Sequence, residues 1–423
     1  MKLSHLVFTS LFILANVAAA VKNATAVPNI YGGIGINGDK SRVFIKFVPG
    51  GKAAALSALG HVGGKVIHSF SELNTFSISL PTAAIDALRR DPKIAFIEQD
   101  PIRSVGPIVQ STAKASPFNR RRATDGQTVP YGVDMVQARD VWDANRDGFV
   151  DEGSPNGSNR MICIIDTGFL VSHEDLQGIN VDGYDGNLPW NKDGHGHGTH
   201  VAGTIAAVNN DFGVVGVTPG TVNLYIVRVF ADDGGWAYAS TLIDAANRCA
   251  SAGANIISMS LGGNYPCLPE QQAFDLLYAQ GILSIAAAGD YGNTEFSYPA
   301  SYPSVMSVAA IDSNKAVDLF SQRNSQVDIA APGVYVLSTV GSSYEYYDGT
   351  SMATPHVSAV AALVWLAMPS ATNKDVRSAL YSSAEDLGVA GRDDVYGYGL
   401  VRAKLAIENL LFGKSMPTPY PTT

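Results

Sequence analysis

The sequence contains little cysteine, with three residues in a chain of 423. At most one disulfide can form, so a large core rather than a disulfide framework must hold the fold together. Cys163 lies inside the apolar run 161–165, where a buried free thiol is the ordinary expectation. Cys249 and Cys267 therefore remain as the candidate disulfide pair, if the chain folds in an oxidising compartment.

Positive charge is also scarce, because 29 Lys and Arg stand against 38 Asp and Glu and leave a net charge of −9. A nucleic-acid partner would favour a basic face, so this balance argues against one. Hydrophobic residues make up 46% of the chain and charged residues 16%, which is an ordinary globular composition. The length allows more than one domain.

The sequence also lacks an apolar run of the roughly 20 residues that a membrane span needs, so we expect no membrane partner. Residues 1–20 fall short of that length. They begin with Lys2, pass through a short apolar core and end on Ala18–Ala20, which is the pattern of a cleaved signal peptide. We therefore expect a secreted, extracellular protein.

Residues 43–104 have the pattern of a small domain of their own. Helical segments at 53–59 and 83–88 separate strand-like segments at 43–48, 66–70, 76–80 and 94–97. The order β-α-β-β-α-β predicts a split βαβ unit, an α+β domain of the ferredoxin-like kind.

Residues 105–122 break this periodicity and end in the basic run Arg120, Arg121, Arg122. Three arginines are more often simply solvated, but their place between two domains favours a processing linker that a protease could cut. Residues 412–423 are rich in Pro and Thr, and we expect them to form a tail.

Residues 123–411 alternate apolar strands with helical stretches. The predicted strands include 161–165, 224–229, 256–259 and 283–287, and the predicted helices include 200–208 and 239–249. Apolar strands buried on both faces are typical of a parallel sheet between helices, so we expect a three-layer α/β fold.

Three polar patches interrupt this apolar structure, at 166–168, 195–203 and 348–356. Asp166 follows a buried strand, His197 precedes a helix, and Ser351 opens a helix in which we expect Pro355 to be tolerated in the first turn. A serine hydroxyl becomes a nucleophile when an imidazole takes its proton and a carboxylate orients that imidazole. Asp, His and Ser supply these roles in one of the known chain orders.

The three patches resemble the motifs of the subtilisin family of serine proteases (subtilases), and the similarity covers essentially residues 127–411. Residues 43–104 resemble the family's inhibitor-type propeptide. The resemblance implies a monomeric serine endopeptidase with protein or peptide substrates, in which Asp166 orients, His197 acts as base and acid, and Ser351 attacks. It also implies that the propeptide assists folding and then acts as an intramolecular inhibitor. His173 and His200 are expected to be structural.

One residue departs from the family pattern at the oxyanion hole, where the family uses the N–H of the serine and an asparagine side chain. Asp290 stands at the asparagine position. An ionised carboxylate donates no hydrogen bond, whereas a protonated one does. We expect activity with an acid-shifted optimum. The alternatives are that Asp290 points elsewhere and only the Ser351 N–H serves, or that the protein is a catalytically impaired peptide binder.

The resemblance implies two substrate-binding segments that hold an extended peptide backbone, made of Ser260, Leu261, Gly262, Ala288 and Gly289. The two glycines leave room for a large side chain, with Ser297 near the pocket floor. We expect a bulky apolar or aromatic residue before the cleaved bond.

A structural Ca²⁺ site is also implied, because the oxygen ligands that calcium prefers are all present. They are the side chains of Gln127, Asp175 and Asn210 and the carbonyls of Val208, Phe212 and Val214. A second loop, 143–154, begins like an EF-hand but has Ser154 where the last glutamate would stand. Calcium insertion and a solvated acidic turn both stay open for this loop.

Overall fold

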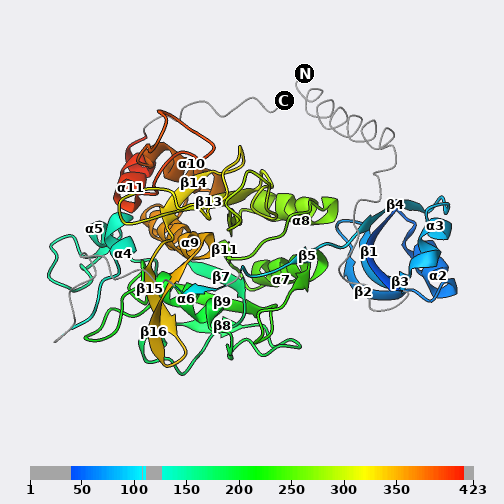
Figure 1. Ribbon diagram of the computed structural model, residues 1–423, viewed down its shortest axis with the longest axis horizontal. Coiled ribbons are helices and arrows are strands. Elements are labelled where there is room, and N and C mark those ends of the chain that lie inside the picture. The colour runs from blue at the N-terminus through cyan, green and yellow to red at the C-terminus, as the bar shows by residue number, and fades with distance from the viewer. Residues whose placement is uncertain (1–39, 107, 111–125, 414–423) are drawn as a thin grey trace, which may run out of the picture.

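The computed structural model describes residues 40–106, 108–110 and 126–413. They form a small N-terminal unit and a large C-terminal unit, and residues 102–106 and 108–110 lead from the first along the second (Figure 1). The expected signal peptide, the arginines at 120–122 and nearly all of the expected tail lie outside the described residues.

The N-terminal unit has the predicted β-α-β-β-α-β order. Its elements are β1 (Lys40–Phe47), α2 (Lys52–His61), β2 (Lys65–Phe70), β3 (Thr75–Pro81), η1 (Thr82–Ala84), α3 (Ile85–Leu88) and β4 (Ile94–Gln99). The strands form an antiparallel sheet in the order β2-β3-β1-β4. Alternation along β1 sends Val43 and Ile45 into this unit's own core and Phe44 to the opposite face. The predicted ferredoxin-like domain is confirmed.

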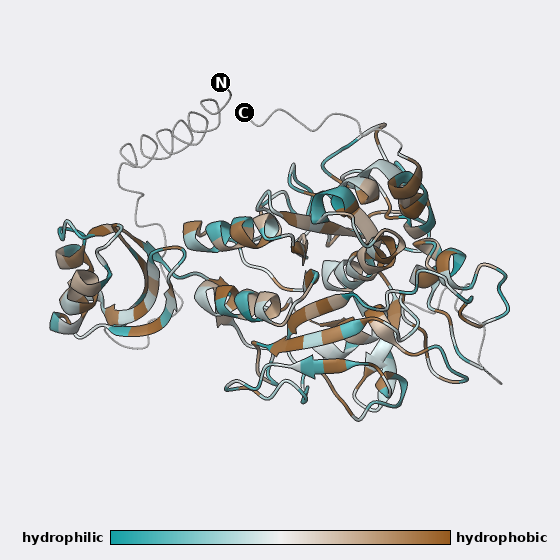
Figure 2. Cartoon of the chain, turned by 180° about the vertical axis from the view of Figure 1, so that it is seen from behind, coloured by the Kyte–Doolittle hydropathy of each residue, from teal (hydrophilic) through white to brown (hydrophobic). Residues whose placement is uncertain are grey.

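The C-terminal unit is built on a seven-stranded parallel sheet in the order β14-β13-β12-β11-β7-β9-β8. The strands are β7 (Met161–Asp166), β8 (Val181–Gly183), β9 (Asn223–Arg228), β11 (Ile256–Met259), β12 (Leu283–Ala287), β13 (Val305–Ile311) and β14 (Ile329–Pro332). Hydrophobic residues run along these strands (Figure 2), and the four central ones are buried almost throughout.

Helices cover both faces of this sheet. Helices α6 (His197–Ala206) and α9 (Thr350–Ala367) pack in one core cluster, and α7 (Ala239–Ser251) and α8 (Leu268–Ala279) pack in the other. The predicted three-layer α/β fold is confirmed. The remaining elements are α4 (Tyr131–Met135), α5 (Arg139–Trp142), η3 (Glu174–Leu176), α10 (Asn373–Ser383), α11 (Ala403–Phe412) and the short strands β5 (Ile102–Arg103), β6 (Val109–Gln110), β10 (Ala237–Tyr238), β15 (Val336–Val340) and β16 (Ser343–Asp348).

Helix α9 corrects the expectation that no segment after residue 20 is apolar enough to span a membrane. By length and composition α9 passes that test. However, 89% of it is buried inside the protein, so it is the core helix of the large unit.

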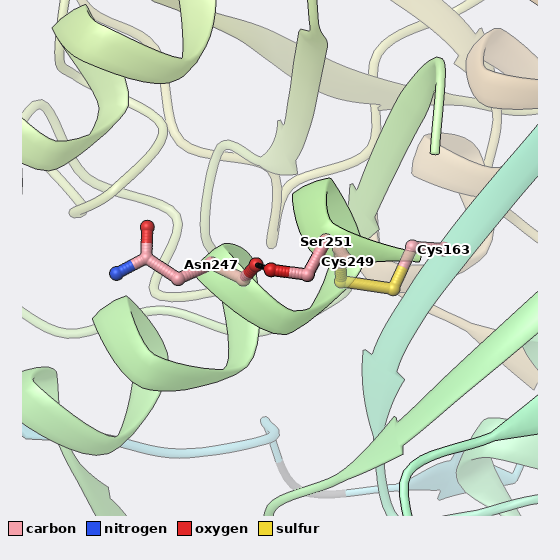
Figure 3. The surroundings of a disulfide bond; sticks show 4 residues. All are labelled: Cys163, Asn247, Cys249 and Ser251. Atoms are coloured by element: carbon pink, nitrogen blue, oxygen red, sulfur yellow. Dashed lines mark hydrogen bonds between the residues drawn. A yellow bond between two sulfur atoms is a disulfide. The ribbon is translucent and has the colours of Figure 1, made fainter. Parts of the chain in front are cut away.

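The disulfide also differs from the expected one. Cys163 on β7 is bonded to Cys249 on α7 (Figure 3), and Cys267 is a buried free thiol. The Cys163 side chain leaves the sheet on the face that α7 covers, so the strand and its covering helix are cross-linked within the core. Burial of Cys163 was therefore the wrong reason to leave it unpaired.

The two units meet through the free face of the small sheet. Phe44, Phe70 and Leu73 form one apolar cluster with residues of α7 and α8. Two carboxylates complete the contact: Asp100 accepts from the N–H of Ser240 (2.9 Å) in the first turn of α7, and Glu98 accepts from the N–H of Leu268 (3.1 Å) at the start of α8. Both therefore cap helix N-termini of the other unit.

Candidate active site

Asp166 and His197 meet at the carboxyl end of the central strand β7. Asp166 is the last residue of β7 and His197 the first of α6, and His197 Nδ1 lies 2.8 Å from Asp166 Oδ1 and 3.0 Å from Oδ2. Both side chains are buried. His197 Nε2 is buried without a hydrogen-bond partner among the described residues, so this nitrogen is left to accept a proton.

The environment of His197 favours a protonated imidazole more than an ordinary site does. Burial alone would lower the pKa of His197, but the charge of Asp166 and its hydrogen bond raise it above the usual histidine value. A base with a raised pKa takes a proton readily when a neighbouring hydroxyl attacks.

Asp193 holds the loop that leads into His197, and the sequence analysis missed it. Its carboxylate accepts from Thr167 Oγ1, the N–H of Gly196 and both the N–H and the hydroxyl of Thr199, at 2.6–2.8 Å. The signal was present: a carboxylate six residues before a threonine in the first turn of a polar helix.

Ser351 lies at the start of α9, which packs against α6. Its Oγ donates to the carbonyl of Ser260 (3.3 Å), and Ser260 Oγ donates to the carbonyl of Ser351 (2.7 Å). Pro355 lies in the second turn of α9, not the first. A proline there cannot donate to the Ser351 carbonyl, so Ser260 supplies the missing donor.

The two histidines expected to be structural are so. His200 Nε2 contacts the carbonyls of Val336 (3.1 Å) and Glu345 (3.2 Å), and its burial lowers its pKa to about 3. His173 bridges the Ser343 carbonyl and the N–H of Asp175. Each ring is thus tied to backbone groups of other segments rather than to Asp166 or Ser351.

Asp290 points toward the start of α9. Its Oδ1 accepts from both the N–H and the hydroxyl of Thr350, each at 2.7 Å. Its Oδ2 faces Gly106 and Gly349, because a Cβ built on either glycine would lie 3.3 Å from it. Burial raises the pKa of Asp290, and the hydrogen bonds from Thr350 offset only part of that rise. Asp290 Oδ2 therefore points toward Gly106, which lies in the segment between the two units.

The chain beside this oxygen is the protein's own, residues 102–106 and 108–110. Strand β5 pairs with β10, Ser104 exchanges two backbone hydrogen bonds with Gly262 (2.9 and 3.0 Å), and β6 pairs with β16. Val109 and Gln110 of the expected linker are therefore paired with the large unit. Its paired residues, 102–104 and 109–110, are extended, as the residues of a bound peptide are.

The expected pocket glycines flank Ser297. A Cβ on Gly262 would overlap Ser297 Oγ, and a Cβ on Gly289 would lie 3.3 Å from Ser297 Cβ. Gly289 also has a φ of 111°, which L side chains rarely adopt. The neighbours Leu261 and Ala288 are buried.

The six expected calcium ligands are brought together. Four oxygens lie 2.6–3.2 Å from Gln127 Nε2: the carbonyls of Val208, Phe212 and Val214 and Oδ1 of Asn210. Asp175 accepts from Asn210 Nδ2 at 2.8 Å beside them. An amide nitrogen carries only two protons, so it cannot satisfy four acceptors, whereas a cation would. The donor set therefore fits Ca²⁺.

The second loop, 143–154, is closed by local hydrogen bonds. Asp143 Oδ1 accepts from the N–H of Gly148, and Asp151 Oδ2 from the N–H of Ala144. Arg139 lies 3.5 Å from Asp143. These contacts are typical of an acidic turn, and they give no support for a bound cation.

Comparison with known proteins identifies several relatives. The sequence profile of the subtilase family matches residues 157–399. Subtilisin J of Geobacillus stearothermophilus is 35% identical over 412 residues, which cover 95% of this chain and 96% of that protein. M-protease of Shouchella clausii (strain KSM-K16) is 37% identical over 354 residues, 84% of each chain. A crystal structure of the psychrophilic subtilisin-like protease Apa1 from the Antarctic psychrotroph Pseudoalteromonas sp. AS-11 is 32% identical, with a TM-score of 0.63, over 69% of this chain and all of Apa1.

Proposed function

This chain belongs to the subtilase family of serine endopeptidases, and from that membership we propose that it is a secreted enzyme made as a self-inhibited precursor. Its substrates are proteins or peptides. The observation that carries the precursor proposal is the path of residues 102–106 and 108–110, which lie along Gly262 and β16 as a peptide bound across Ser351 would.

In the proposed mechanism Ser351 Oγ attacks the carbonyl carbon of the scissile peptide while His197 Nε2 takes the hydroxyl proton. Asp166 holds the imidazole with Nδ1–H directed at its carboxylate and stabilises the imidazolium. The tetrahedral intermediate collapses when His197 returns the proton to the leaving amine, which leaves an acyl group on Ser351. Water then attacks this ester by the same proton route and releases the second product.

The developing oxyanion would be met by the N–H of Ser351 and by Asp290 in its protonated form. The raised pKa of Asp290 and the direction of Oδ2 support this role. The Thr350 donors fix the carboxyl group by its other oxygen, so Oδ2 is the one that would carry the proton.

Residues 43–104 would act as the inhibitor, and Ser104 to Gly106 would occupy the substrate groove until they are cut. Asp100 and Glu98 support a folding role as well, because they cap the N-termini of α7 and α8 from the small unit. We propose that residues 1–20 direct export, that 105–122 are the processing linker and that 123–411 are the catalytic domain, which acts as a monomer.

Calcium would bind between Gln127, Asp175 and the loop 208–214. A bound cation would satisfy the converging oxygens and tie the chain after the linker to the end of α6. Its role would be structural, because its ligands are not those of the Asp166, His197 and Ser351 site.

Serine-directed labelling tests the proposal. The processed enzyme is treated with a fluorophosphonate between about pH 4 and pH 9, the range in which His197 and Asp290 can titrate, and the modified residue is found by mass spectrometry. Modification of Ser351 supports the enzyme. Absence of labelling at every pH, with residues 43–104 removed, would favour the impaired peptide binder.

Processing supplies a second readout. The full chain and its Ser351→Ala variant are expressed in parallel, and their N-termini are determined. Self-processing predicts a cut in the first chain and an intact second chain, and the new N-terminus distinguishes a cut near Ser104 from one after Arg122.

A further inference from the structure

Arg103 of the segment that crosses the site is held in a buried ion pair. Its Nε lies 3.0 Å from Glu270 Oε1 and its Nη2 2.5 Å from Glu270 Oε2, and both side chains are fully buried. A guanidinium and a carboxylate that meet through two parallel hydrogen bonds form one of the strongest and most directional polar contacts in proteins. Glu270 lies in the first turn of α8, on the catalytic unit.

The rest of this pocket also suits a guanidinium. Arg103 Nη2 donates to the carbonyl of Tyr265 (3.0 Å) and Nη1 to that of Ile102 (2.8 Å), and Tyr302 donates its hydroxyl to Glu270 Oε2 (2.7 Å). Within the described part of the chain, Tyr302 is the only side chain besides Arg103 that donates to Glu270. When residues 40–106 leave, the Glu270 carboxylate loses the Arg103 guanidinium. A buried carboxylate that lacks a partner cation is energetically unfavourable.

The pairing register gives the place of this pocket relative to the cleaved bond. Ser104 lies opposite Gly262 in antiparallel pairing, so Gly106 lies opposite Ser260, whose carbonyl contacts Ser351 Oγ. Residue 106 is thus the one next to the catalytic serine. If the cleaved bond follows residue 106, then residue 106 is the first residue before that bond and Arg103 is the fourth.

We propose that Glu270 forms a subsite that selects substrates with arginine at the fourth position before the cleaved bond. The proposal rests on the proposed protease function and adds a substrate class to it: extended peptides with Arg followed by three residues and the cut. Arg103 is then the first ligand of this subsite, and substrates take its place after processing. Lysine can supply the charge but not the two-pronged contact, and a neutral side chain supplies neither.

The test uses the processed enzyme and three fluorogenic peptides that are identical except at the fourth position, which carries Arg, Lys or citrulline. Citrulline keeps the shape of arginine without its charge. We expect kcat/KM for the Arg peptide to exceed that for the citrulline peptide by about tenfold or more, with Lys between them. Glu270→Gln should bring the Arg to citrulline ratio to within about twofold.

Asp275→Asn is the matched control, because it removes one carboxylate from the exposed side of the same helix and should keep the wild-type ratio. Equal cleavage of the Arg and citrulline peptides by the wild-type enzyme overturns the subsite while the protease function stands. No cleavage of any peptide, together with no fluorophosphonate labelling of Ser351, overturns both. The wild-type ratio decides the question even if Glu270→Gln does not fold.

Discussion

Ser260 and Ser351 hold each other through two hydrogen bonds, one in each direction. The hydroxyl of Ser260 donates to the Ser351 carbonyl at 2.7 Å, and the hydroxyl of Ser351 donates to the Ser260 carbonyl at 3.3 Å. Pro355 removes the helical donor that the Ser351 carbonyl would otherwise receive. The position of the candidate nucleophile therefore depends on a residue that is itself expected to bind substrate.

Replacement of Ser260 by Ala should weaken both stability and catalysis. The buried Ser351 carbonyl would lose its donor, at a cost of about 1–3 kcal/mol in the free energy of unfolding. We expect kcat to fall more than KM rises, because Ser351 would lose its fixed place. Thermal unfolding and steady-state kinetics check this, with Ser260→Thr as the variant that keeps the hydroxyl. Unchanged kcat in Ser260→Ala would show that the bond is dispensable.

Asp290→Asn should move the pH optimum upward. Asp290 can donate to an oxyanion only below its raised pKa, so wild-type kcat is expected to fall as pH rises through that pKa. Asparagine donates at every pH, so the variant should keep its activity at higher pH. At the acid end both enzymes should lose activity as His197 becomes protonated. Because the pKa of His197 is raised, this loss begins at a higher pH than it would for an ordinary histidine.

The control for Asp290 is Glu295→Gln, which neutralises an exposed carboxylate in the same loop and should leave the pH profile as it is. If Asp290→Asn has the turnover and pH profile of the wild type, Asp290 takes no part in oxyanion binding.

Chelation should destabilise the protein through the loop at 208–214. With calcium at about a hundred times its Kd, removal by EGTA should cost about 2.7 kcal/mol. The melting temperature of the Ser351→Ala chain, measured with and without EGTA, tests this without self-digestion. Asp175→Asn should reduce the difference, and Asp211→Asn, an exposed neighbour outside the ligand set, should preserve it. If the melting temperature is the same with and without EGTA, the proposed calcium site is excluded.

Loss of the Cys163–Cys249 disulfide should lower stability substantially. The bond closes a loop between residues 86 apart in sequence, and chain entropy then predicts a contribution of about 4–5 kcal/mol. Urea unfolding of Cys163→Ala/Cys249→Ala in the Ser351→Ala background measures it. Cys267→Ala removes a buried thiol that bears no cross-link and should cost much less. Equal losses in the two cases would assign the effect to cavities alone.

The cleaved N-terminal domain should be released as pH rises. Burial against α8 raises the pKa of Glu98 to about 7, so the complex takes up a proton that the free domain lacks at the same pH. This contribution favours the complex at mildly acid pH and is lost as pH rises through about 7. Size-exclusion chromatography of the processed protein should show more of residues 40–106 retained at about pH 5.5 than at pH 8.

Glu98→Gln should flatten that pH dependence, since a neutral amide resembles the protonated acid. Glu72→Gln removes an exposed carboxylate of the same domain and should leave it intact. Retention that rises with pH in the wild type would contradict the assignment.

Patterns that depend on one element or on local order were predictable from the sequence. The strands at 256–259 and 283–287 have the expected bounds, and Asp166 and His197 meet as their places at element ends indicated. Contacts between the layers of the fold were not predictable in this way. Cys163 carries no sign that α7 covers it with a second cysteine.

The segment that begins at Ser104 shows a second limit of sequence patterns. Its backbone hydrogen bonds go to Gly262 and β16 rather than to a strand of its own sheet, so no periodicity marks it. The role of Glu270 was equally hard to predict. Acidic residues are common in the first turn of a helix because the helix dipole favours them there. Only the arrival of Arg103 from another unit distinguishes Glu270.

Because residues 102–106 and 108–110 lie along the catalytic unit of the same chain, the first proposed turnover is an event within one molecule. Enzyme and peptide need not meet by diffusion, so the rate of this step is independent of protein concentration, and dilution cannot stop it. Every later cleavage is bimolecular and slows as substrate is diluted. The time that the protein spends as a precursor is therefore set by a barrier inside each molecule, while its working rate is set by its surroundings.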